Sequence, residues 1–254
     1  MSSTAQYTES PIPASAAAVC EAVWRVAFSS ATEDWLVLPD GCVDIVLVPD
    51  APPLVAGPAT GPSRFDFPAG TNAAGLRLLP GAGPALLGLP AEELADRLIP
   101  LTDLGGPRWP DELARAHEAV QAGSSASAAG WLLTALGRVK RADRPDSMVR
   151  HAAELLRHDP GLATGELALR DRQPRRRFVA QVGHGPKRFA RIMRLQRLLH
   201  LGRRHPEATL GWLAAAAAYA DQAHLAHDCH ELAGRTPTAL LAQRSTVVTR
   251  ERAA

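Results

Sequence analysis

The sequence of 254 residues has few cysteines, few aromatic residues and no long apolar run. The three cysteines, Cys20, Cys42 and Cys229, are too few and too scattered for a disulfide framework or a paired-cysteine metal site. No run of about 18 apolar residues occurs, so no membrane-spanning helix is expected. The start, MSSTAQYTES, lacks the basic and apolar segments of a secretion signal. We therefore expect a cytoplasmic protein whose cores consist mainly of Leu, Ala and Val.

Sequence signatures of common enzymes are also missing. There is no glycine-rich phosphate loop of familiar spacing, no GxSxG motif and no HExxH motif. The first 139 residues contain a single histidine, His117, which is too few for a multi-histidine metal cage. We accordingly expect neither enzymatic activity nor a cofactor.

What the sequence does have is a strong division of charge. Residues 1–139 carry 7 Lys and Arg against 15 Asp and Glu, a balance of −8. Residues 140–254 carry 21 against 11, a balance of +10, together with eight of the nine histidines. This asymmetry favours two domains, of which the second faces a polyanion such as nucleic acid.

The acidic half is predicted to be β-rich. In 19–28, the side chains of Cys20, Ala22, Trp24, Val26 and Phe28 alternate onto one face. Pro39–Asp40–Gly41 is a strong turn signal, expected to join 35–38 and 42–48 in a hairpin. Further strands are expected at 53–56, 63–67 and 75–79, followed by helices at 91–98, 110–122 and 126–141.

The basic half is predicted to be helical throughout. The polar stretch at 140–145, which ends in a proline, is the best candidate for a linker. After it, Asp146 or Ser147 can cap a helix that runs to about His158. No strand is expected after it, and the last ten residues are expected to fray. The predicted organisation is a domain at 7–139, a linker at 140–146 and a second domain at 147–245.

The most informative segment of the basic half is 218–234. An apolar helix around Leu213 leads to a tight corner at Ala218–Ala220, where Asp221 can cap the next helix. That helix presents Gln222, His224 and His227 and ends at Gly234. An ordinary helical hairpin is one interpretation, and the turn and second helix of a helix-turn-helix is the other.

Further motifs occur in order along this half: RQxRRRF at 172–178, VGxxPKRFxRxxRxQR at 182–197, AYADQAH at 218–224 and GxTP at 234–237. Over about 147–243 the chain resembles the AraC/XylS family of transcription regulators. That resemblance implies two helix-turn-helix units joined by a long helix, which sit in successive major grooves of DNA. A connecting helix from Pro186 to Gly202 would span roughly 25 Å.

The resemblance also implies which residues contact DNA. The recognition helices match 171–182 and 221–232, and Lys187 would contact phosphate. The implied contact residues in these helices are Arg172, Arg175, Arg176, Gln222, Ala223, His224, Ala226 and His227. Arg188, Arg191 and Arg194 would either contact phosphates or form ion pairs within the domain. Double-stranded operator DNA is the implied partner, while a small-molecule effector, RNA polymerase and a second copy of the chain are left open.

The chain departs from the family pattern in three places. Pro174 replaces a leucine, which is tolerable only within the first helical turn. The segment before Arg172 is about four residues short if 163–168 is the first helix of its unit, and the alternative at 160–166 is a poor helix sequence. Ala218 replaces the usual glycine, and a left-handed backbone there would cost about 1 kcal/mol.

The acidic half resembles, more loosely, the N-terminal domain of one branch of AraC-type regulators. The resemblance rests on Trp24, the VLPDGCVDI run at 37–45 and the segment at 75–106. The resemblance implies a β-rich, cupin-like domain for sensing or dimerisation, so that the whole chain is of the α+β class. The best pocket markers are Trp24, Trp35, Asp40, Asp44, Arg64 and Arg77, among which Trp24, Asp44 and Arg77 are the candidate ligand-binding residues.

Simpler interpretations of these residues stand beside the functional ones. Asp40 can be a turn residue that bonds its own backbone, and Asp44 needs a partner such as Arg77 only if it faces the core. His224, His227, Cys229 and His230 suggest a metal site without a second ligand pair, so no metal is expected. Cys42 or Cys20 could be a thiol sensor, although no activating base is evident. An adaptor that binds an acidic protein is the alternative to a DNA-binding regulator.

Overall fold

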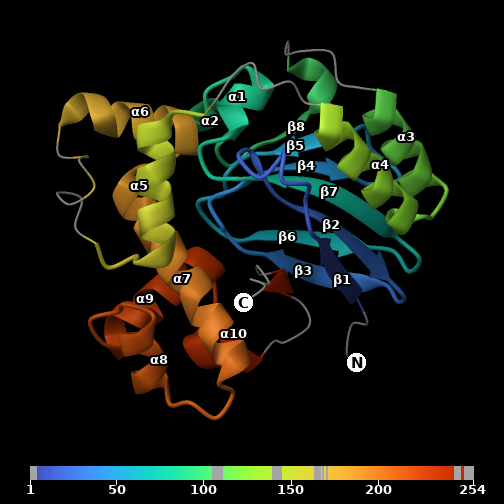
Figure 1. Ribbon diagram of the computed structural model, residues 1–254. Coiled ribbons are helices and arrows are strands. Elements are labelled where there is room, and N and C mark those ends of the chain that lie inside the picture. Colours follow the sequence, from blue (N-terminus) through green and yellow to red (C-terminus); the bar gives the residue numbers. More distant parts are fainter. Residues whose placement is uncertain are drawn as a thin grey trace.

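The computed structural model describes residues 5–104, 111–138, 145–162, 167, 169, 171–242 and 247–248. A β-rich first part is followed by a helical second part, which confirms the predicted α+β class (Figure 1). The strands of the first part are β1 Ala5–Ser10, β2 Cys20–Phe28, β3 Thr32–Val37, β4 Val43–Leu47, β5 Leu54–Ala56, β6 Ser63–Phe67, β7 Asn72–Leu78 and β8 Leu98–Pro100.

Within these described ranges the strands form two sheets. The larger has the order β1-β2-β7-β4-β5-β8, and the smaller has the order β6-β3-β9. The predicted hairpin between 35–38 and 42–48 is therefore wrong, because β3 pairs with β6 whereas β4 pairs with β5 and β7. The intervening turn instead carries the chain from one sheet to the other, with Gly41 at a φ of 76°.

Strand β2 contributes to two cores, one on each of its faces. Trp24, Val26 and Phe28 pack with Trp35 of β3 between the sheets. Cys20 and Val23 instead join a core with the outer helices. The prediction that Cys20 shares a face with Trp24 is wrong, because the register with β7 shifts between Cys20 and Ala22. Such a bulge moves the following side chains to the opposite face.

Helices cover the outer face of the larger sheet (Figure 1). They are α3 Asp111–Gln121 and α4 Ser125–Arg138, and Leu113, Ala116 and Leu132 pack on β-strand residues such as Ile45 and Leu76. The short helices α1 Gly83–Leu87 and α2 Ala91–Leu94 precede β8 and a 3₁₀ turn at Leu101–Asp103. The predicted helix at 91–98 is too long, since Asp96 has a φ of 57° and β8 begins two residues later.

The second part contains helices α5 to α10. Their bounds are α5 Ser147–His158, α6 Arg172–Val182, α7 Pro186–Arg204, α8 Leu210–Ala216, α9 Gln222–Ala233 and α10 Pro237–Ala242. The prediction that α7 ends at Gly202 is wrong by two residues. Gly202 lies inside the helix, where an added Cβ would come within 2.4 Å of the Leu241 side chain of α10.

Two predictions about chain segments need comment. The expectation that no strand follows the linker is wrong, because β9 Val247–Val248 pairs in parallel with Leu36 and Val37 of β3. Most of the expected linker at 140–146 lies outside the described residues, as do most of the residues of either alternative first helix before Arg172. The domain boundaries given above stay predictions.

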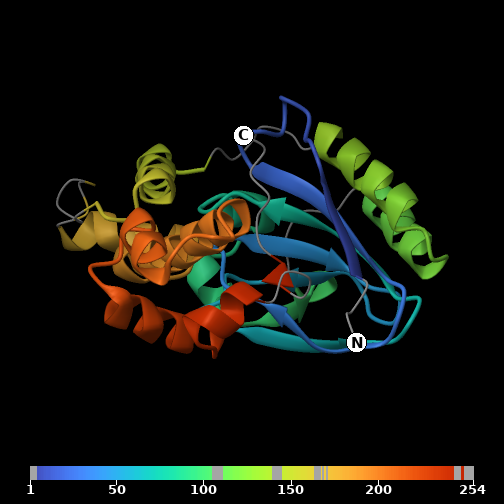
Figure 2. The same ribbon diagram turned by 90° about the horizontal axis from the view of Figure 1, so that it is seen from below.

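The two parts share one apolar core. Leu36 and Leu38, at the end of β3, belong to the same buried cluster as Val149 of α5, Phe178 of α6 and Phe189 of α7. Figure 2 shows α5 to α10 gathered on one side of the sheets. Among the helices of the described residues, no candidate for a membrane span occurs.

Candidate DNA-binding interface

The first expected recognition helix is α6, which runs from Arg172 to Val182. Pro174 is its third residue, so the proline lies within the first turn, where backbone N–H groups have no helical partner. Helix α6 therefore forms despite the departure from the family pattern. It ends at Gly183 in the left-handed conformation, with a φ of 91°.

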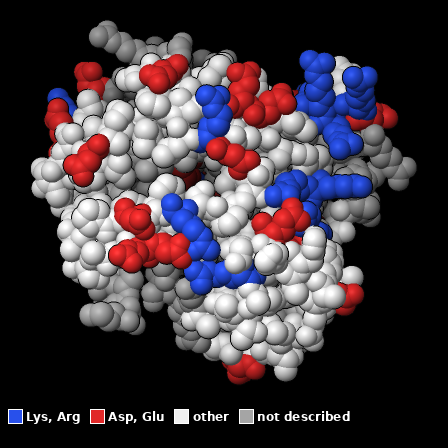
Figure 3. Space-filling model, turned by 180° about the vertical axis from the view of Figure 1, so that it is seen from behind, with Lys and Arg blue, Asp and Glu red and all other residues white. Residues whose placement is uncertain are grey.

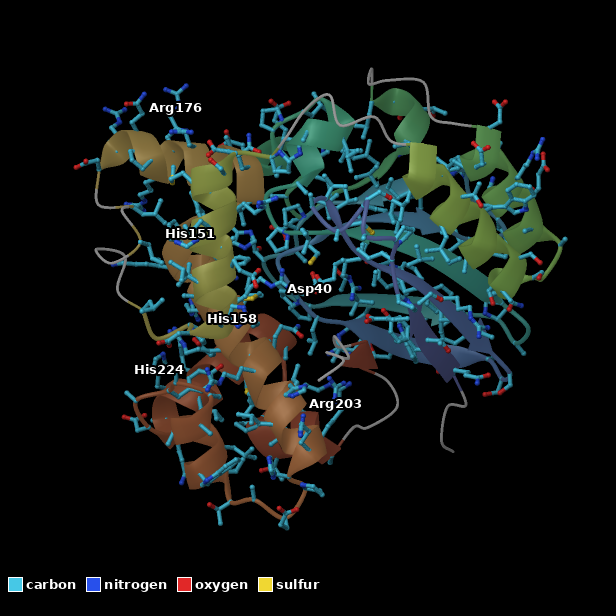
Figure 4. The ribbon with its side chains drawn as sticks, in the orientation of Figure 1. Asp40, His151, His158, Arg176, Arg203 and His224 are labelled. Carbon is cyan, nitrogen blue, oxygen red and sulfur yellow. The ribbon has the colours of Figure 1, made fainter. Side chains whose placement is uncertain are left out.

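The predicted DNA-contact residues of α6 all lie at the protein surface. Arg172, Arg175 and Arg176 are exposed, and Figure 4 shows Arg176 on the outer side of the helix, pointing away from the sheets. Arg177 differs, because its guanidinium forms an ion pair of 2.6 Å with Asp146, which caps α5. The sequence prediction missed this bracing role of Arg177.

Helix α7 connects the two halves of the helical part. It has 19 residues, which at 1.5 Å per residue is roughly 28 Å of helix. Lys187 is exposed near its N-terminus, as a phosphate contact requires. A helix of this length can place two DNA-binding units in grooves about 34 Å apart.

The arginines of α7 form ion pairs within the helical part. Arg191 donates to Asp228 at 2.8 Å, and Arg188 and Arg191 both pair with Glu231. The hydrogen bond and charge of Arg191 lower the pKa of Glu231 to about 2. Of the two roles left open for Arg188 and Arg191, the structure supports the ion pair, and both tie α9 to α7.

The second unit begins with α8, which Thr209 caps by accepting a bond from the Trp212 N–H at 3.2 Å. The chain then turns at Ala218, which has the left-handed conformation, with a φ of 65°, despite its Cβ. Tyr219 follows as a buried residue whose ring lies near the Arg194 guanidinium. This sharp corner sets the direction of α9.

Helix α9 has the capping expected from its sequence. The Asp221 carboxylate accepts a bond of 2.7 Å from the His224 N–H, and Gly234 ends the helix with a φ of 64°. Leu225 and Cys229 are buried beneath it. The opposite face is therefore left for solvent or a ligand.

The predicted contact residues of α9 fall into two groups. Gln222, Ala223, Ala226 and His227 are exposed. His224 is half-buried, since its ring packs edge-on against Tyr219 at 5.2 Å and lies 3.9 Å from the Asp228 carboxylate (Figure 4). These contacts fit His224 better as a brace of the corner than as a freely reaching side chain.

Basic side chains gather on the side of the helical part. In Figure 3 several blue Lys and Arg side chains cluster over the α6 end of the molecule, and others lie beside red side chains near the centre of the view. Arg191 of α7 is paired with Asp228 and Glu231, whereas Arg172, Arg175 and Arg176 of α6 and Lys187 are exposed. This charge suits a phosphate backbone.

A second cluster of functional groups lies in the β-rich part, and its centre is Arg77. The Arg77 guanidinium pairs with Asp40 at 3.1 Å, Asp44 at 3.1 Å and Glu9 at 3.4 Å, while its side chain is only 5% exposed. The Trp24 indole donates to Asp44 at 3.1 Å. We call these five residues the Arg77 cluster. Of the two alternatives left open for Asp44, the structure supports the one in which it pairs with Arg77.

Burial shapes the chemistry of the Arg77 cluster. Desolvation raises the pKa of Asp44 to about 6, although Arg77 acts in the opposite direction. Asp40 also accepts a bond of 2.9 Å from the Cys42 N–H, which confirms its role in a turn. Three carboxylates around one guanidinium leave the cluster rich in negative charge. Glu9 of β1 was missed because the sequence predicted no strand there.

The other pocket markers lie elsewhere. Trp35 packs in the core between the sheets, edge-on to Phe28 at 5.0 Å. Arg64 is exposed and pairs with Asp34. The structure thus brings together Trp24, Asp40, Asp44 and Arg77 but neither Trp35 nor Arg64.

The thiol and metal alternatives gain no support from the geometry. All three cysteines are buried, and burial raises the pKa of Cys20 and Cys229 to about 12 and that of Cys42 well above its usual value. A buried, protonated thiol reacts slowly. Among the described residues, no group of three or more His, Cys, Asp or Glu side chains could hold a metal ion.

Two segments of the chain match known protein families. Residues 163–243 match the family described as a helix-turn-helix domain. These residues form an AraC-type helix-turn-helix domain. This domain is a DNA-binding module of transcription regulators, and it contains α6, α7, α8 and α9 in full. Residues 13–100, ahead of the helix-turn-helix domain, match a domain of unknown function, DUF6597.

Two further comparisons were less informative. A lysine-to-alanine variant of apo ToxT from Vibrio cholerae is similar over 94% of this chain and 96% of its own, with 11% identity and a TM-score of 0.43. Identity and TM-score are too low for this likeness to bear on function. No match was found among curated proteins.

Proposed function

We propose that the chain is a sequence-specific transcription regulator that reads operator DNA through α6 and α9. The observation that carries the proposal is the exposed face of α9. Gln222, Ala223, Ala226 and His227 lie together on it, on a helix that Asp221 caps. Glutamine can bond both N6 and N7 of adenine, and alanine can pack on a thymine methyl group. Arg172, Arg175 and Arg176 of α6 and Lys187 of α7 add contacts to phosphates or guanines.

A selection from random duplexes with the full-length protein tests this proposal. We expect one enriched motif, and loss of all enrichment would contradict sequence-specific binding. Gln222→Ala should then weaken binding by about 1–3 kcal/mol and relax the preference at a single base position. Gln121→Ala, an exposed glutamine of the β-rich part, is the matched control and should leave the motif unchanged.

We further propose that the β-rich part senses a small molecule at Trp24, Asp44 and Arg77. The support is the cost of burying these charges, which a protein seldom bears without a functional reason. A thermal-shift screen of the full-length protein should find compounds that stabilise it, and Trp24→Phe should reduce that stabilisation. Compounds that stabilise wild type and Trp24→Phe equally would contradict this assignment. RNA polymerase and a second copy of the chain are further proposed partners, and the nucleoid is the proposed location when DNA is bound.

A further inference from the structure

The turn at 39–42 touches both the Arg77 cluster and the helix-turn-helix domain. On one side, the Asp40 carboxylate pairs with the Arg77 Nε at 3.1 Å. On the other side, the Pro39 carbonyl accepts a bond of 2.7 Å from the Gln196 side chain of α7, in a buried position. Figure 4 shows Asp40 at the junction between the strands and helices α5 and α7.

The fit between this turn and α7 is tight. A Cβ on Gly41 would lie 2.5 Å from the Phe189 ring and 3.4 Å from the Met193 Cε. Phe189, Met193 and Gln196 are spaced by four and three residues, so they form one face of the helix. The turn therefore packs on α7 along two helical turns.

Helix α7 in turn controls the placement of both DNA-binding units. It packs against α5, α6, α8, α9 and α10, whereas α6 also packs against α1 and α2 of the β-rich part. Arg191 joins it to Asp228 of α9, whose side chain is only 1% exposed. A shift or rotation of α7 against the turn would therefore change the relative position of α6 and α9.

Among the carboxylates around Arg77, Asp40 is the one best able to change partner. Its side chain is 22% exposed, against 14% for Glu9 and 17% for Asp44. It is also held by a turn, whereas Glu9 and Asp44 lie within paired strands. Because Asp40 and the contacts to α7 are within two residues of each other, its bond to Arg77 constrains those contacts directly.

We propose that the turn at 39–42 is a positioning element for DNA reading, in which the Asp40–Arg77 ion pair and the Pro39–Gln196 hydrogen bond together set the placement of α7. The spacing of the two recognition helices thus depends on the Arg77 cluster. This inference rests on the proposed DNA-binding function, and it makes Asp40 and Gln196 positioning residues that touch no DNA themselves.

The test measures spacing preference with the full-length protein. Duplexes carrying the selected motif are prepared with its two halves at the best spacing and one or two base pairs closer or farther apart. Asp40→Asn removes the ion pair but keeps an oxygen for the Cys42 N–H, and Gln196→Met removes the bond to Pro39. Asp66→Asn is the matched control, because its carboxylate also bonds a backbone N–H, that of Asp34 at 2.9 Å.

We expect both test variants to lower the affinity ratio between best and altered spacing by about fivefold or more. The affinity ratio of the double variant should be little lower than that of either single variant, because both changes act through the same turn at 39–42. A wild-type spacing profile in either folded variant, or an equal loss in Asp66→Asn, would overturn the inference. Cooperative thermal unfolding establishes folding, and Gln196→Met decides alone if Asp40→Asn does not fold. Absence of any enriched motif for wild type would contradict the proposed function instead.

Discussion

Ala218 is a single residue whose backbone conformation has a measurable cost. Its φ of 65° is unfavourable for any residue with a Cβ, by about 1–2 kcal/mol. Ala218→Gly relieves that strain but loosens the unfolded chain, so we expect a net stabilisation of about 0.5–1 kcal/mol. Urea unfolding of the full-length protein measures it. Ala217→Gly, at a φ of −90°, should destabilise the protein, and equal effects at both positions would refute the explanation.

His184 is a buried residue whose protonation should lower the stability of the folded protein. Burial first, and Arg188 second, lower its pKa to about 4, and neither ring nitrogen has a hydrogen-bond partner among the residues that the structure describes. The unfolded chain, with a pKa near 6.5, therefore binds a proton more readily than the folded one. The stability that neutral His184 allows is complete above about pH 6.5 and is lost as the pH falls toward 4.

A comparison of variants isolates this effect from other titrating groups. Relative to His184→Leu, the wild type should lose about 3 kcal/mol of stability between pH 7 and pH 4. Denaturant unfolding at several pH values measures the difference. His151→Leu, at an exposed histidine of α5, is the matched control. A difference that does not change with pH would contradict the assignment.

At the scale of elements, α7 and α9 are held together by ion pairs as well as by a shared apolar core. Asp228 is nearly inaccessible, and Arg191 supplies its shortest ion pair at 2.7 Å. Arg191→Met would leave that carboxylate buried with only distant partners, so we expect a loss of about 3 kcal/mol. Arg204→Met, at an exposed arginine at the end of α7, should cost less than about 0.5 kcal/mol. Thermal unfolding that shows similar losses in both would contradict this account.

The helices and strands also show which structural features could be predicted from the sequence. Helix α9 was predicted from Asp221 and Gly234, because caps act within a few residues of the chain. Arg77 could be named as a partner of Asp44 for the case in which Asp44 faces the core, because a buried charge needs a partner. The wrong hairpin between β3 and β4 had local turn signals in its favour, but strand partners are chosen by packing far along the chain. The bulge in β2 likewise depends on its partner strand.

Some features of the site had no signal in sequence alone. The two roles considered for Arg188 and Arg191 could be separated only once Glu231 and Asp228 were placed beside them. Glu9 enters the Arg77 cluster through the pairing of β1 with β2, and a six-residue edge strand of mixed polarity is hard to recognise.

At the scale of the whole molecule, the free basic charge predicts a steep salt dependence. Each phosphate contact adds about 0.9 to the slope of log affinity against log salt. Lys187→Met should lower that slope by about 1 and weaken specific and random duplexes alike. Titrations of the full-length protein between low and physiological salt measure it. Arg97→Met, at an exposed arginine of the β-rich part, is the control, and an equal change there would contradict a contact at Lys187.

The apolar cluster that contains Leu36 and Leu38 has a practical consequence for protein engineering. Transplanting the helix-turn-helix domain onto another sensor would leave Phe178 and Phe189 without two of the side chains that now complete their cluster. Such a chimaera would expose an apolar surface to water and would tend to aggregate. The two parts of this chain are consequently poor candidates for modular exchange unless the end of β3 is transferred together with the helix-turn-helix domain.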